Sequence, residues 1–110
     1  MNVRKFVGLY NLDTSQVLDM SLMFCGCGVE QLDLRSFQTN RVEGMVDMFY
    51  DCPWLESLDI STFNPKNLQY ANMFLDGCDS LHIFYASQAI SKILDMYKPK
   101  EEEYCRTRSA

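Results

Sequence analysis

The sequence lacks the features that mark membrane-spanning and exported proteins. None of its apolar runs approaches the roughly 20 residues that a membrane-spanning helix needs. Two basic residues stand near the start, but no apolar stretch long enough for a signal peptide follows them. If Met1 is the natural start, we therefore expect a cytoplasmic protein.

A zinc site of paired cysteines and histidines is also lacking. His82 is the only histidine, and the lone Cys25-x-Cys27 pair has no second pair at a matching spacing. We therefore expect no metal and no cofactor, although a redox or metal protein that uses Cys25 and Cys27 remains an alternative. The five cysteines are an odd number, which excludes a fully paired disulfide framework.

Basic residues are few in the body of the chain. Residues 7–97 hold twelve acids and four bases, a net of minus eight, whereas residues 1–6 and 98–110 hold six bases and three acids, a net of plus three. An acidic body repels phosphate, so we expect no direct binding of nucleic acid. It attracts a basic partner surface, although the same charge also serves solubility alone.

What the sequence does contain is one phrase in three copies, at residues 17–27, 42–52 and 68–78, with a period of 25–26 residues. A repeat this short cannot bury its own apolar face, so the copies must stack on one another. We predict a single domain at residues 1–98, with repeats near 7–31, 32–57, 58–83 and 84–98, followed by a charged tail at 99–110 that is frayed or extended.

Each repeat is predicted to hold a strand and then a helix. Leu32, Leu34 and Phe37 alternate with Asp33 and Arg35, which is typical of a strand with one buried face. Equivalent positions predict four strands, which begin near residues 7, 32, 58 and 84. Within the three long phrases, apolar residues recur at offsets 0, 3, 6, 7 and 10, which favours one face of a helix. A last helix is expected over residues 86–98.

The third phrase admits two registers. Aligning it on Met73 needs a deletion and an insertion, whereas a gapless alignment satisfies the apolar offsets directly and moves Met73 to a flank. The gapless register is preferred. Cys27, Cys52 and Cys78 end the three phrases, and we expect them to be free core thiols. Layers of helices about 8–10 Å apart would hold them beyond bridging distance.

The order Leu-Asp-Leu-x-x-Phe, then Thr, Val, Met, Met-Phe and Cys, resembles the BspA-type leucine-rich repeat of the DUF285 family over residues 9–84. The resemblance implies a short right-handed solenoid of the α/β class, with strands on one side and helices on the other. It also implies a binding scaffold, because the family's longer members are surface adhesins, and it supplies no catalytic residues. Pro53-Trp54 departs from the small polar residues that usually follow the cysteine.

The sequence shows no combination of nucleophile, base and acid at a spacing that would indicate catalysis. We therefore expect no enzymatic activity and no catalytic residue. A tryptophan in a loop and a row on the exposed sheet face are instead candidates for binding a protein. The candidate partner-binding residues are Trp54, Tyr10, Asp33, Arg35, Asp59, Ser61 and Tyr85. Two other interpretations remain open, namely that Trp54 covers the core and that the sheet face is merely solvated.

The leading functional hypothesis is a stand-alone module that binds a protein with a basic surface. Its sharpest form is a phage or mobile-element inhibitor of the anti-CRISPR kind, and the alternative is a small adhesin homologue that binds a host protein or glycan. Because the first strand has little sequence before it, a homodimer through the N-terminal end is also predicted.

Overall fold

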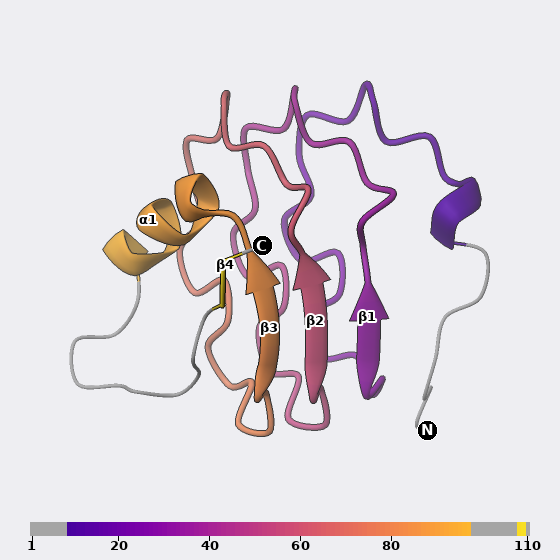
Figure 1. Cartoon of the computed structure of the whole chain (residues 1–110), viewed down its shortest axis with the longest axis vertical. Coiled ribbons are helices and arrows are strands. Elements are labelled where there is room, and N and C mark those ends of the chain that lie inside the picture. The colour runs from indigo at the N-terminus through magenta and orange to yellow at the C-terminus, as the bar shows by residue number, and fades with distance from the viewer. Residues whose placement is uncertain (1–8, 98–107, 110) are drawn as a thin grey trace.

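The strands follow one another in chain order across a single parallel sheet, β1-β2-β3-β4 (Figure 1). The structure is a computed structural model that describes residues 9–97 and 108–109. Its elements are a short 3-10 helix η1 (Leu9–Asn11), strands β1 (Gln31–Asp33), β2 (Ser57–Ile60) and β3 (Ile83–Ala86), helix α1 (Gln88–Tyr97) and strand β4 (Arg108–Ser109). These residues form a small compact domain with three parallel strands at its centre and one helix at the end.

The strands form where the sequence alternates between apolar and polar residues. Leu32 of β1 pairs with Leu58 of β2, which pairs with Phe84 of β3, and all three side chains are buried. The predicted strands near residues 32, 58 and 84 are therefore confirmed. The strand predicted over residues 7–12 falls partly outside the described residues, and its described part contains η1 instead of a strand.

The three long phrases are runs of overlapping turns, and their prediction as helices is wrong. In the first phrase, the N–H groups of Met23, Cys25 and Cys27 each donate to the carbonyl three residues earlier. Alternate N–H groups donate instead to the next phrase along the chain, from residues 20, 22, 24 and 26 to the carbonyls of residues 44, 46, 48 and 50. The backbone is therefore satisfied between repeats, whereas a helix would satisfy it within each repeat.

Backbone conformation explains why these phrases do not continue as helices. Two equivalent positions in every phrase have positive φ, one of them occupied by Leu22, Asp47 and Met73 and the other by Gly26, Asp51 and Gly77. A right-handed helix needs negative φ at every residue, so a left-handed residue at intervals of four breaks it. In the described part of the chain, α1 is the only α-helix.

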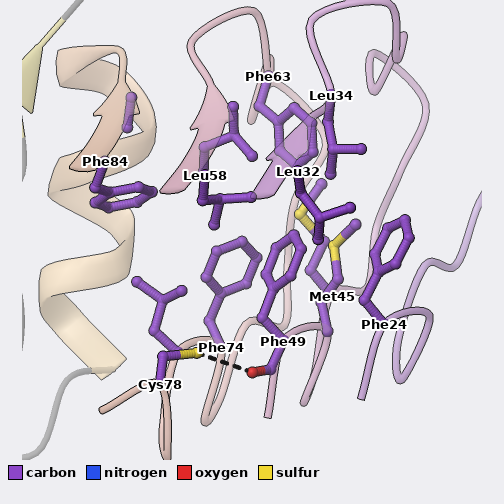
Figure 2. Packing of buried hydrophobic residues seen from close by; sticks show 14 of the residues in the cluster. Phe24, Leu32, Leu34, Met45, Phe49, Leu58, Phe63, Phe74, Cys78 and Phe84 are labelled. Atoms are coloured by element: carbon purple, nitrogen blue, oxygen red, sulfur yellow. Dashed lines mark hydrogen bonds between the residues drawn. The ribbon is translucent and has the colours of Figure 1, made fainter. Parts of the chain in front are cut away.

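The core lies between the sheet and the turns, and aromatic rings stack through it from repeat to repeat (Figure 2). Phe24 stacks on Phe49 with ring centroids 5.6 Å apart, and Phe49 meets Phe74 edge-on at 5.0 Å. All five apolar positions of the second phrase are fully buried, namely Val42, Met45, Met48, Phe49 and Cys52. The apolar offsets thus predicted the buried positions of the second phrase correctly, although they indicated the wrong secondary structure; in the first phrase the equivalent Met23 is exposed.

Hydrogen bonds between the second and third phrases confirm the gapless register. The N–H of Phe49 donates to the carbonyl of Phe74, and the N–H of Asp51 donates to that of Asp76. This ladder places Leu75 in the column of Phe49, where it is buried, and leaves Met73 on the surface with 43% of its area exposed.

Two buried threonines link consecutive repeats by hydrogen bonds. The hydroxyl of Thr39 donates to the carbonyl of Asn64 at 3.1 Å and accepts the N–H of Asn64 at 2.7 Å. Thr14 makes the same pair of bonds with Gln38 one repeat earlier. Because each hydroxyl satisfies a donor and an acceptor of the next repeat, these buried polar groups are fully hydrogen-bonded.

Helix α1 lies beside β3 at the end of the stack (Figure 1). Ile90 and Leu94 point into the core and are buried, which confirms the helix predicted over residues 86–98. Most of the predicted charged tail lies outside the described residues. Its residues 108 and 109 form β4, which pairs with β3.

Candidate functional site

The exposed face of the sheet carries one row of side chains from neighbouring strands. Asp33 of β1 pairs with Asp59 of β2, and Asp59 pairs with Tyr85 of β3. Since side chains alternate across a strand, all three project from the face opposite the core. Asp33 and Tyr85 are exposed and Asp59 is partly exposed. Three of the predicted binding residues therefore lie next to one another.

Arg35 joins the two aspartates of this row. Its Nε lies 2.9 Å from Oδ1 of Asp33, and its second terminal nitrogen lies 2.7 Å from Oδ2 of the same carboxylate. The same Nε lies 3.6 Å from Oδ2 of Asp59. Hydrogen bonding from Arg35 lowers the pKa of Asp33, and the same bonds raise the pKa of Arg35. The row keeps one uncompensated negative charge instead of two.

The aspartates also have a local structural role. The N–H of Ser61 donates to Oδ1 of Asp59 at 2.9 Å, and the N–H of Arg35 donates to Oδ1 of Asp33 at 3.1 Å. Each carboxylate thereby accepts a backbone bond from the residue two positions later, which is an Asx turn at the end of a strand. Ser61 therefore lies beside the row, as predicted, and its backbone helps to hold Asp59.

Tyr10 and Trp54 do not join this row. Tyr10 lies on η1 with 74% of its area exposed. Trp54 is 52% exposed and lies in the turn before β2, where the N–H of Leu55 donates to the carbonyl of Cys52. In the described part of the chain, no hydrogen bond, ion pair or ring contact connects either residue to the row. Trp54 is thus a separate exposed aromatic side chain.

A second charged surface, which sequence reasoning missed, lies on the turns. The three long phrases contain five acids and no base, namely Asp19, Glu43, Asp47, Asp51 and Asp76. Exposed apolar side chains stand among them, namely Leu22, Tyr50, Tyr70 and Met73. We call these nine residues the turn surface. The absence of bases was visible in the sequence, and these positions would also share one face of a helix, opposite the apolar stripe, so the sequence carried a signal for this surface.

One carboxylate of the turn surface, that of Asp76, lies where its charge is disfavoured. Asp47 and Asp76 each keep one oxygen that is buried and has no hydrogen-bond partner among the described residues. Burial, and then the charge of Asp47, raise the pKa of Asp76. The ionised form of Asp76 is therefore less favourable in the folded protein than in the unfolded chain.

Replacing Asp76 with Asn should raise the free energy of unfolding at neutral pH. A carboxyl with a raised folded-state pKa costs stability wherever it is ionised, and this cost disappears below its ordinary value of 3.8. Urea titrations of both proteins should therefore diverge at neutral pH and converge in acid. Asp51→Asn, which removes an exposed charge of the same surface, serves as the control. An equal gain in acid would contradict this assignment.

Cys25 and Cys27, on which the redox alternative rests, lie in different surroundings. Cys25 is exposed, whereas the thiol of Cys27 lies 3.9 Å from that of Cys52 in the next repeat. Among residues 9–97 and 108–109, no three histidine, cysteine or acidic side chains gather as metal ligands would. No helix in that part is both long enough and apolar enough to cross a membrane.

Comparison with known proteins gives one match. Residues 2–102 match the protein family described as "Mycoplasma protein of unknown function, DUF285". No curated protein and no solved structure matches the chain. The match covers nearly the whole chain, including all three phrases and the strands between them.

Proposed function

We propose that this chain, which belongs to the DUF285 family, is a non-enzymatic module that binds another protein. The observation that carries the proposal is the row Asp33, Asp59 and Tyr85, which lies in register on the exposed face of three hydrogen-bonded strands. A rigid sheet presents these side chains in fixed positions, so little conformational entropy is lost when a partner binds them.

We infer that the repeats form a short right-handed solenoid. The ladder of backbone bonds between phrases and the parallel pairing of the strands support this inference, because each repeat then contacts only its neighbours. Such an array presents extended surfaces rather than an enclosed pocket, which suits recognition of a macromolecule.

The partner in this proposal is a protein with a basic surface. The sheet row keeps a net negative charge, and the turn surface carries five acids without a base. An inhibitor of the anti-CRISPR kind, made by a phage and acting in the cytoplasm, is the sharpest form of the proposal, because such a target has a basic channel for nucleic acid. The adhesin alternative predicts a host protein or glycan as the partner.

Self-association through the N-terminal end would depend on side chains. The carbonyls of Asp19, Ser21, Met23 and Cys25 face away from the second repeat, and no described N–H group donates to them. Two copies that met through these turns would oppose acceptor to acceptor, so backbone pairing between the turns is disfavoured. A homodimer would instead bury the exposed side chains of Leu12 and Met23.

Binding should depend on salt and on the sheet row. In the experiment, the chain is immobilised and a protein that it captures is identified by mass spectrometry. The association rate of the two proteins is then measured at increasing salt concentration. Screening over about 8 Å at physiological ionic strength should slow association, and the double change Asp33→Asn, Asp59→Asn should slow it further. Trp54→Ala should instead speed dissociation, because an aromatic anchor acts on the bound complex.

A matched control separates the two acidic surfaces. Asp47→Asn, Asp76→Asn removes the same charge from the turn surface and should leave association unchanged if the sheet row is the contact. The opposite result would move the binding site to the turn surface, and insensitivity to both pairs and to salt would refute electrostatic recognition. A gel shift with DNA and RNA should show no retention, and salt-sensitive retention would overturn the proposal.

A further inference from the structure

Cys27 and Cys52 lie side by side across the first two repeats. Their Sγ atoms are 3.9 Å apart, although the residues are 25 positions apart in the sequence. The N–H of Gly26 donates to the carbonyl of Tyr50 at 2.8 Å, so the two backbones lie at hydrogen-bonded strand spacing, about 4.7–4.9 Å. Disulfides form between Cα atoms about 4.4–6.8 Å apart, so this backbone spacing meets the requirement.

The three stacked thiols differ in their access to solvent. Cys52 and Cys78 are buried. The thiol of Cys52 donates to the carbonyl of Phe24 at 3.1 Å, and that of Cys78 donates to the carbonyl of Phe49 at 3.1 Å (Figure 2 shows the second bond). Cys27 belongs to the first repeat and is only partly buried. A small oxidant can therefore reach Cys27 first, and Cys52 is the buried thiol next to it.

We propose that Cys27 and Cys52 are an oxidisable thiol pair, a modification site at which a peroxide couples them into a disulfide between the first and second repeats. The Cys27 sulfur loses its proton and attacks one peroxide oxygen, and the O–O bond breaks to give a sulfenic acid and hydroxide, which takes up that proton as water. The Cys52 sulfur then attacks the Cys27 sulfur, loses its proton and displaces a second water. Two electrons pass from the sulfurs to the peroxide.

The surroundings keep both groups protonated as thiols, so they react only under lasting exposure to an oxidant. The hydrogen bond to Cys52 and partial burial raise the pKa of Cys27. The bond from Cys27 lowers the pKa of Cys52, but the bond with Cys78 and burial outweigh it and raise that pKa to about 11. Because the thiolate is the reactive form, we expect coupling over hours rather than seconds.

A disulfide between Cys27 and Cys52 would stabilise the first repeat, which is packed less completely than the second. Cys27 ends the first phrase, in which Met23 is 41% exposed whereas its equivalent in the second phrase, Met48, is fully buried. A covalent link to Cys52 closes a loop of about 25 residues and restricts the unfolded chain. The first repeat would therefore stay docked on the second at temperatures that otherwise release it.

Hydrogen peroxide and the full-length chain test the proposal, with Cys25 and Cys105 replaced by Ser to prevent side reactions. Peptide mapping should recover Cys27 linked to Cys52, with the linked pair two hydrogens lighter than the two reduced peptides together, whereas oxidation of exposed methionines adds oxygen to other peptides. The oxidised protein should unfold at a higher temperature, and reduction should reverse that shift. Cys78→Ser in the same background should leave the link intact.

One further variant and two contrary outcomes keep the test decisive. Cys27→Ser changes a partly exposed residue of the end repeat and should fold normally without forming any link. A link between Cys52 and Cys78 in place of the expected one would refute the site. Retention of two alkylatable thiols at Cys27 and Cys52 after prolonged exposure to peroxide would refute it as well.

Discussion

Phe49→Ala is expected to lower the free energy of unfolding by about 3–5 kcal/mol, the range for removing a large buried aromatic ring. Phe49 is fully buried at the centre of the aromatic stack, between the rings of Phe24 and Phe74. Truncation removes both ring contacts and leaves a cavity that two hydrogen-bonded neighbouring repeats cannot easily fill. Chemical denaturation of both proteins, with equal slopes confirmed, measures the loss.

Met23→Ala is the matched control for this prediction. Met23 belongs to the same apolar stripe, but it lies in the end repeat and is 41% exposed, so its truncation should cost much less than that of Phe49. A loss below about 1 kcal/mol for Phe49→Ala would show that the stack does not hold the repeats together. Equal losses for the two variants would show that position within the stack is unimportant.

The apolar spacing predicted the core but could not predict the backbone that presents it. Offsets of 0, 3, 6, 7 and 10 place side chains on one face of a helix, and overlapping turns of three to four residues place them on one face equally well. The helix and the overlapping turns differ in the carbonyl groups to which their N–H groups donate. The sequence did carry a signal, since Gly26, Asp51 and Gly77 occupy one equivalent position and glycine and aspartate tolerate left-handed backbone.

The same error reached the cysteines. Helical layers would hold equivalent residues about 8–10 Å apart, and that premise led to the prediction that the cysteines lie too far apart to bridge. Hydrogen-bonded turns bring the repeats to strand spacing, so the thiols of Cys27 and Cys52 lie 3.9 Å apart. The prediction that these cysteines stay free thiols stays a prediction, and the geometric reason given for it was wrong.

The sheet row was predictable because a strand has a period of two and parallel strands keep register. Asp33, Asp59 and Tyr85 occupy the same place in their repeats, so one alignment of the repeats brings them together. The ion pair of Arg35 with Asp33 could have been inferred from their separation of two residues at the end of the strand. The turn surface was also open to prediction, because its positions in the three phrases fall on one face of a helix, opposite the apolar stripe.

Gly77→Ala is expected to destabilise the protein more than Gly26→Ala, although the two glycines occupy equivalent positions. Both have positive φ, 86° for Gly77 and 71° for Gly26, so alanine costs about 1–2 kcal/mol in backbone strain at either position. A Cβ on Gly77 would also lie 3.0 Å from Cα of Asp51 and 3.1 Å from its N, whereas a Cβ on Gly26 would meet nothing within 4 Å.

The extra cost at Gly77 follows from how tightly the repeats are joined. The neighbouring atoms belong to backbone, and the N–H of Asp51 donates to the carbonyl of Asp76 at 2.8 Å, so neither repeat can retreat without weakening the ladder. Forcing a methyl group into filled space costs typically about 1–3 kcal/mol, which should appear as the difference between the two variants in urea titrations. Equal losses would mean that the second and third repeats separate easily, and that hydrogen bonds between repeats do not hold the surfaces in place for a partner.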